Sequence, residues 1–262
     1  MKTTVNGTEI YYEIHGKEGA PWIVMSHSLA CSVRMWDEQI ASFKDKYRIL
    51  AFDTRGHGSS AAPSGAYTLE MLADDAKGVM DKEGVKRCHW VGLSMGGMIG
   101  QTFALKYPGV FQTLTLADTT SRYPAEGAAL WADRIKTAES KGMEPLVEGT
   151  LARWFTEPYR KAAPQRLDDI ARLIRNTPVA GYVGCCHAIP KINLTARLKD
   201  IACPILVIVG EQDMGTPPAM AKEIHDNAPG SKLVVIPEAA HISNVEQPAA
   251  FDKALAALFS SS

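Results

Sequence analysis

Ser94 stands in the sequence Gly92-Leu93-Ser94-Met95-Gly96 and is the first candidate for chemistry in this chain. A serine hydroxyl is a poor nucleophile at neutral pH, so it needs a histidine that removes its proton and an acid that orients this histidine. The pattern Gly-x-Ser-x-Gly often arises by chance, so its setting decides its meaning. Residues 89–92 are typical of the end of a buried strand, and residues 95–100 open a helix of small residues. A strand, a sharp turn and a helix in this order predict a nucleophile elbow, with Ser94 as the nucleophile.

The histidine must follow the serine in the chain, because folds built on this elbow carry the order serine, acid, histidine. Only His187, His225 and His241 follow Ser94. His187 falls in a predicted insertion and His225 within a predicted helix. His241 lies in the loop after the last predicted strand and just before the last helix, and is the predicted base.

The acid is expected in a loop at the carboxyl edge of the sheet, where Ser94 also lies. Asp213 meets this condition in the loop Gly210-Glu211-Gln212-Asp213. Asp118, at the end of the strand before the insertion, is an alternative acid; otherwise it caps or hydrogen-bonds the start of the insertion. Glu211 is a second alternative that comes early in its turn. We predict Asp213.

A tetrahedral intermediate needs amide donors for its negative oxygen, and one comes from the residue after the nucleophile, here Met95. The second is expected from the turn after strand 22–26, where the Leu29 amide is the candidate. Ser28 fills a position that is usually glycine in His-Gly motifs. His27 is interpreted as a structural residue of this turn.

A glycine-rich loop at residues 53–60 lacks the spacing and the lysine of a phosphate-binding loop, and it lacks the third glycine of a dinucleotide-binding turn. We interpret it as structural, with Arg55 as an alternative substrate contact.

Alternating strands and helices predict a mostly parallel, twisted sheet with flanking helices. An antiparallel hairpin is expected around Asn6-Gly7. Buried strands are predicted at 22–26, 49–52, 88–92, 113–117, 204–209 and 232–236, and helices from about Val33, Thr68, Met95 and Pro217 and at 248–259.

Residues 120–191 lose the strand pattern and show proline-punctuated helical stretches at 129–138, 146–155 and 166–176. We predict an inserted helical cap over 120–191 and a core domain formed by 1–119 and 192–262.

The composition, with 46% hydrophobic and 22% charged residues and a net charge of -1, is that of a globular chain. Without a run of like charges, neither nucleic acid nor a membrane is expected as a partner, which leaves a small molecule. The first residues lack the pattern of a signal peptide, so the expected location is cytoplasmic. Five cysteines without paired spacing predict free thiols and no metal site, and the adjacent Cys185 and Cys186 are expected to pack in a helix.

These residues resemble the 3-oxoadipate enol-lactonases of the α/β-hydrolase superfamily over nearly the whole chain. The resemblance rests on these pieces: His27-Ser28-Leu29, Met35-Trp36-Asp37, the 53–59 loop, the Ser94 elbow, residues 181–189, Gly210-Glu211-Gln212-Asp213 with Thr216-Pro217-Pro218, and residues 239–248. It implies the α/β-hydrolase fold and places the family's triad on Ser94, Asp213 and His241.

The chain departs from the family at Met95, usually Leu, and at Ala30, usually Gly, and two larger apolar groups are expected to narrow or reshape the acyl pocket. The family's substrate carries a free carboxylate, which needs a cationic partner. The candidates are Arg34, Arg134 and Arg153, and the alternative for each is a solvated surface arginine. Trp131 is a further candidate contact.

The expected activity is hydrolysis of a carboxylic ester or lactone through an acyl-enzyme, without a cofactor. 3-Oxoadipate enol-lactone is the first substrate hypothesis. A broad carboxylesterase with perhydrolase side activity is the second hypothesis. A cofactor-free oxygenase and a non-catalytic ligand receptor on the same fold are a third and a fourth.

Overall fold

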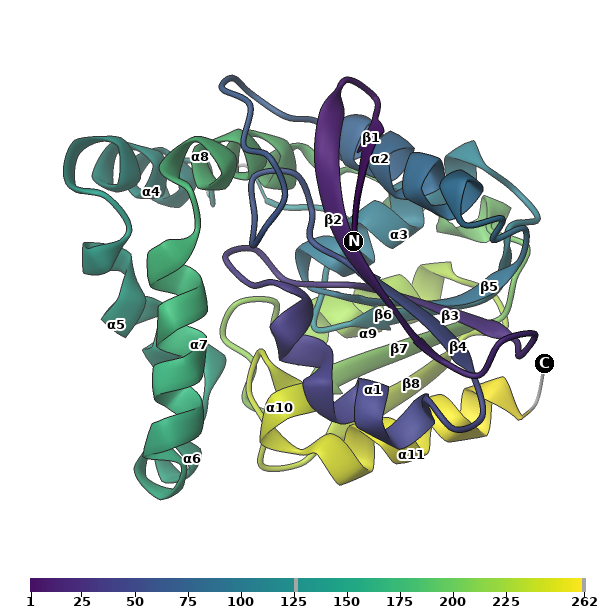
Figure 1. The fold of residues 1–262 in the computed structure, drawn as a ribbon. Coiled ribbons are helices and arrows are strands. Elements are labelled where there is room, and N and C mark those ends of the chain that lie inside the picture. The colour runs from purple at the N-terminus through teal and green to yellow at the C-terminus, as the bar shows by residue number, and fades with distance from the viewer. Residues whose placement is uncertain (125–126, 261–262) are drawn as a thin grey trace.

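A computed structural model describes residues 1–124 and 127–260. Its core is an eight-stranded sheet in the order β1-β2-β4-β3-β5-β6-β7-β8 (Figure 1). The two N-terminal strands pair antiparallel with their neighbours, and all other neighbours are parallel. This confirms the predicted fold class. The strands are β1 (Lys2–Val5), β2 (Thr8–Gly16), β3 (Trp22–Ser26), β4 (Arg48–Phe52), β5 (Cys88–Leu93), β6 (Phe111–Ala117), β7 (Ile205–Gly210) and β8 (Lys232–Ile236).

The N-terminal hairpin turns at Asn6 and Gly7, whose φ angles are 48° and 72°. Two consecutive residues with positive φ give the turn that matches the right-handed twist of paired strands, and Asn-Gly is the dipeptide that adopts it most readily. The hairpin prediction is confirmed, and β1 lies at the edge of the sheet.

Helices cover both faces of the sheet (Figure 1). Every residue of β5 and β7 is buried, and apart from His89 in β5 these strands carry no polar side chain instead of alternating polar and apolar residues. Thr68 caps α2 as expected, since its side chain accepts a hydrogen bond from Met71 N at 3.1 Å. The helix expected from Val33 begins as a 3₁₀ turn (Val33–Trp36). One face carries α1 (Asp37–Phe43) and α11 (Pro248–Phe259), and the other carries α2 (Leu69–Lys82), α3 (Met95–Lys106) and α9 (Pro218–Asn227).

Among the described residues, five α-helices between β6 and β7 stand beside the carboxyl edge of the sheet (Figure 1). Two of them, α6 and α8, lie outside the three stretches predicted by periodicity. Prolines occupy the first turn of α5, α6 and α7, where the missing N–H has no intrahelical partner to lose, so they start helices instead of breaking them. The helices are α4 (Ala128–Lys141), α5 (Glu144–Trp154), α6 (Glu157–Ala162), α7 (Pro164–Asn176) and α8 (Val179–Ala188).

The two ends of this insertion lie side by side. Leu194 N donates to Ser121 O at 2.7 Å, and Arg122 and Asn193 form an isolated antiparallel β-bridge. We use the word cap for residues 120–191, whose division from the core stays a prediction. Residues 125–126 of the cap and residues 261–262 of the core lie outside the described residues. Within the described residues, no helix is long and apolar enough to cross a lipid bilayer.

Candidate active site

Ser94 occupies the sharp turn between β5 and α3, with φ 55° and ψ −114°. This is a strained backbone conformation for a residue that carries a Cβ atom. The glycines around it allow close approach of the backbone. A Cβ atom added at Gly96 would lie 2.0 Å from Ser26 O, and one at Gly92 would lie 2.2 Å from Gly96 O. The turn therefore has the strain and the packing of the predicted elbow.

The strain at Ser94 has a measurable cost in stability. We expect Ser94→Gly to be more stable than Ser94→Ala by about 1 kcal/mol, because glycine adopts positive φ freely and alanine keeps the strain. Thermal unfolding should show this as about 2–4 °C in Tm for a domain of this size. An alanine variant as stable as the glycine variant would contradict a strained turn.

Ser94, His241 and Asp213 form one chain of hydrogen bonds, although they come from three separate loops. His241 Nε2 lies 3.0 Å from Ser94 Oγ, and His241 Nδ1 lies 2.9 Å from Asp213 Oδ2. Because a carboxylate only accepts, Nδ1–H donates to Asp213 and leaves Nε2 free to accept from the serine. The structure thus brings together the three residues selected from the sequence, in an arrangement that can activate a hydroxyl group.

The charges within this chain of hydrogen bonds shift two pKa values in opposite directions. Burial lowers the pKa of His241, but the Asp213 carboxylate raises it more, so that it lies above its ordinary value. Burial raises the pKa of Asp213, but His241 and the donors from Thr216 lower it to below its ordinary value. Asp213 Oδ1 also accepts from Gly215 N at 2.7 Å, and Thr216 Oγ1 donates to Oδ2 at 2.8 Å. Asp213 is therefore held as a carboxylate.

Asp118, the second candidate acid, does not contact His241 by a hydrogen bond. Its carboxyl group accepts from Gly210 N at 2.8 Å and from Ser243 Oγ at 2.5 Å. The expectation that it caps the start of the insertion is wrong, because both donors belong to the core. Burial raises the pKa of Asp118, and the neighbouring Asp213 carboxylate raises it further. Asp118 links the loop that carries Asp213 to the segment after His241.

The remaining candidate bases and the third candidate acid lie away from the serine. His225 is within α9 as predicted, and its Nδ1 lies 2.8 Å from Ser231 Oγ. His187 is in α8 and lines a separate surface hollow. Glu211 accepts from Glu238 N at 3.4 Å.

Two backbone amides lie beside Ser94 without an acceptor. Within the described residues, neither Leu29 N nor Met95 N donates a hydrogen bond. The turn that carries Leu29 is held by buried His27, whose Nδ1 donates to Ser28 O at 2.7 Å and whose Nε2 accepts from Thr54 N at 2.9 Å. Burial lowers the pKa of His27 to about 4, so the ring is neutral. Its bonds fit the structural role expected for it.

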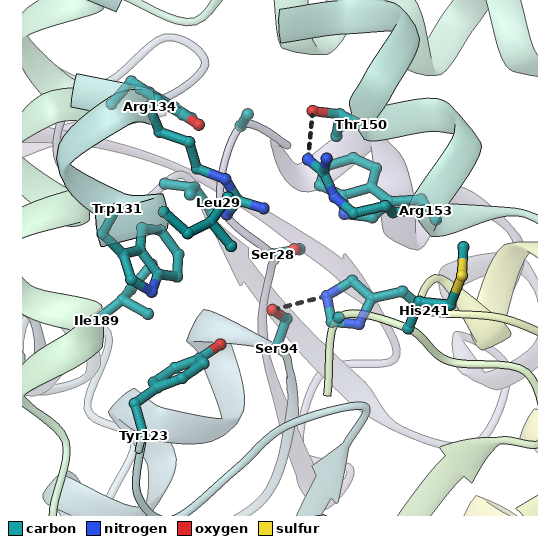
Figure 2. A pocket seen from close by; sticks show the side chains of 16 residues that line it. Ser28, Leu29, Ser94, Tyr123, Trp131, Arg134, Thr150, Arg153, Ile189 and His241 are labelled. Carbon is teal, nitrogen blue, oxygen red and sulfur yellow. Dashed lines mark hydrogen bonds between the residues drawn. The ribbon is translucent and has the colours of Figure 1, made fainter. Parts of the chain in front are cut away.

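A pocket of about 110 Å³ opens above Ser94 between the cap and the sheet (Figure 2). Ala30, whose φ is 58°, lines this pocket, and a positive φ is a backbone conformation that favours glycine. The expected effect of the Met95 side chain on the pocket is not found, since that side chain is fully buried and the lining residues do not include it. The lining consists of Ser28, Leu29, Ala30, Ser94, Tyr123, Leu130, Trp131, Arg134, Thr150, Arg153, Trp154, Tyr182, Ile189, Met214, Gly215 and His241.

Two arginines of the cap reach into this pocket, Arg134 from α4 and Arg153 from α5 (Figure 2). Arg134 lies over the ring of Trp131, 4.7 Å from its centroid, and Arg153 Nη2 donates to Thr150 Oγ1 at 3.4 Å. In the part of the chain that the structure describes, neither guanidinium forms an ion pair. Burial and then the charge of Arg134 lower the pKa of Arg153. The pocket therefore holds two cations that no carboxylate of the described residues neutralises.

For two other arginines, the structure contradicts the expected contact with the substrate. Arg34 pairs with Glu13 and with Asp37, the latter at 3.0 Å, and is not part of the pocket. Arg55 is buried and forms an ion pair with Asp75. Both arginines have carboxylate partners, so neither is left to meet a substrate.

Several lining residues were not found by sequence reasoning. The Tyr123 hydroxyl points toward Ser94 (Figure 2), and the ring of Trp154 lies 6.2 Å from that of His241. Leu130 and Met214 are exposed apolar side chains of the lining. None of these residues belongs to a motif with known spacing, so only the packing of the cap shows where they lie.

The fold and the site together define a hydrolase of the α/β class. The sequence pattern of the family described as alpha/beta hydrolase fold matches residues 21–248. The chain therefore belongs to the α/β-hydrolase family.

Within that family the chain is lactonase-like. It is 33% identical to 3-oxoadipate enol-lactonase 2 of Acinetobacter baylyi, over 97% of this chain and 94% of that protein. The solved enol-lactonase from Burkholderia xenovorans LB400 is similar at 36% identity and a TM-score of 0.96, covering 99% of this chain and 100% of that one. A thermophilic esterase from Thermogutta terrifontis, solved with malate bound, is similar at 28% identity and a TM-score of 0.93, covering 100% of this chain and 98% of that one.

Proposed function

We propose that this protein hydrolyses a lactone or ester that carries a free carboxylate, with 3-oxoadipate enol-lactone as the substrate. The observation that carries this proposal is the pair Arg134 and Arg153, two cations in the pocket above Ser94 that form no ion pair with any of the described residues. A carboxylate between them would form charge-assisted hydrogen bonds and relieve their mutual repulsion. The similarity to enol-lactonases supports this choice, and so does the malate-bound esterase, since malate carries carboxylates.

The roles in the proposed reaction follow from the geometry. Ser94 Oγ attacks the carbonyl carbon of the substrate while His241 Nε2, 3.0 Å away, removes its proton. Asp213 holds the tautomer of His241 and stabilises the imidazolium. The amides of Leu29 and Met95 donate to the negative oxygen. His241 then protonates the leaving oxygen, and the ring of a lactone opens. In the second half of the reaction His241 removes a proton from water, the water attacks the acyl-enzyme, and His241 returns the proton to Ser94 Oγ as the acid is released.

The arginine pair provides the test. In Arg134→Met and Arg153→Met, we expect KM for the enol-lactone to rise at least about tenfold each, and about 100-fold in the double variant, because each lost charge-assisted bond is worth about 1.5–3 kcal/mol. The rate with p-nitrophenyl acetate, a neutral ester, should change little. Steady-state kinetics on both substrates measures the difference.

Arg172→Met is the matched control, since Arg172 is an exposed cap arginine that pairs with Asp169. It should leave both substrates unaffected. Equal losses on the neutral ester and the lactone would contradict a carboxylate subsite. Good turnover of neutral esters without any lactone turnover would favour the broad carboxylesterase.

A further inference from the structure

Glu246 is a buried carboxylate at the end of α10 (Ser243–Glu246), and it connects the cap with the loop of His241. Its Oε2 accepts from Ala240 N at 2.8 Å, one residue before His241. Its Oε1 accepts from Thr156 N at 2.9 Å and also from the Thr156 hydroxyl, and Thr156 lies between α5 and α6 of the cap. In the described residues no cation pairs with Glu246, so these three donors compensate its burial.

A second contact holds the other side of the histidine. Ile242 N donates to Trp154 O at 3.2 Å, and the Trp154 ring lies 6.2 Å from the His241 ring. The backbone amide after His241 thus donates directly to the cap segment 154–156. The amide before His241 donates to Glu246, which in turn accepts from Thr156 of the same segment. The loop between β8 and α10 has no regular secondary structure of its own at these positions.

We propose that Glu246 is a positioning residue through which the cap segment 154–156 holds His241 in reach of Ser94. The inference rests on the proposed function, since it gives His241 a role in proton transfer. Proton transfer at this site depends on the 3.0 Å separation of Nε2 and Oγ, and a shift of about 1 Å at a reacting group can cost about 100-fold in rate. Glu246 does not touch the substrate pocket, so it acts on the rate and not on binding.

Glu246→Gln tests this directly. The amide keeps one oxygen acceptor and replaces the other with an N–H₂ group, which faces a donor and cannot accept from it. We expect kcat for the enol-lactone to fall about 10- to 100-fold with KM changed less than about threefold. The rate at which a fluorophosphonate probe labels Ser94 should fall by the same factor as kcat. Hydrogen exchange at the Ala240 amide should become faster.

A pair of threonine variants separates positioning from loss of stability. Thr156 and Thr68 each cap a helix, α6 and α2, through hydrogen bonds to Tyr159 N at 3.3 Å and Met71 N at 3.1 Å. Thr156→Ala removes the hydrogen bond that caps α6 and also the hydroxyl bond to Glu246. We expect kcat to fall about 3- to 10-fold. Thr68→Ala removes only the hydrogen bond that caps α2. It should therefore lower Tm without changing kcat, probe labelling or hydrogen exchange at the Ala240 amide.

Unchanged kcat and labelling in Glu246→Gln would overturn the proposal, as would a loss in Thr68→Ala equal to that in Thr156→Ala. If Ser94 of the unmodified protein does not react with the probe and no lactone is hydrolysed, the proposed function fails and the role of Glu246 in the reaction fails with it. The two outcomes can be told apart, because the role of Glu246 is tested only when the unmodified protein reacts with the probe and hydrolyses the lactone.

Discussion

Ser94→Ala is expected to lower kcat/KM for lactone or ester hydrolysis by at least about 10,000-fold. The alanine variant keeps the backbone turn and the unpartnered amides of Leu29 and Met95 but has no group that can form the acyl-enzyme. Residual hydrolysis would come from the pocket and these donors alone. Steady-state rates with the enol-lactone and with p-nitrophenyl acetate measure the loss.

The same variant distinguishes serine-dependent hydrolysis from the two alternatives, a cofactor-free oxygenase and a non-catalytic ligand receptor. Fluorophosphonate labelling of the unmodified protein should occur at Ser94 and disappear in Ser94→Ala. Retained activity in the variant would support a reaction that needs no nucleophilic serine, such as cofactor-free oxygenation. A folded unmodified protein that fails to react with the probe would support a ligand receptor.

Asp213→Asn is expected to lower kcat/KM about 10,000-fold, because an amide can no longer hold the tautomer that leaves Nε2 free to accept from Ser94. It should also change the pH profile. His241 must be neutral to act as a base, and its pKa lies above the ordinary value of 6.5, so activity in the unmodified protein is lost as pH falls through that raised pKa. Without the Asp213 charge, burial dominates and lowers the pKa of His241. The acid limb of kcat/KM should therefore move to lower pH.

Asp118→Asn is the matched control for this prediction. Asparagine keeps an oxygen that can accept from Gly210 N, and its amide group can donate to Ser243 Oγ. We expect a loss below about tenfold, because Asp118 makes no hydrogen bond with His241. A large loss in Asp118→Asn together with a small loss in Asp213→Asn would show that Asp118 is the acid.

The strands and the order of the three polar residues were predictable because they depend on local patterns. Buried parallel strands such as β5 and β7 are mostly apolar runs, and the turns after them place Ser94 and Asp213 at the same sheet edge. The short cap helices were harder to predict. Pro158, in the first turn of α6, looks like a helix break in the sequence, and α8 is so evenly apolar that it shows no helical period.

The sequence by itself determined the fold, the elbow at Ser94 and the partners His241 and Asp213, because periodicity and loop position follow from neighbouring residues. Only the tertiary structure decided which arginines face the pocket. Arg34, Arg134 and Arg153 were equivalent candidates in the sequence. Packing placed Glu13 beside the first, but among residues 1–124 and 127–260 it gave the other two no carboxylate partner. The link from Thr156 through Glu246 to Ala240 also appeared only there, since it joins residues about 90 positions apart. Contacts of that separation depend on how the cap packs on the sheet, which no local pattern encodes.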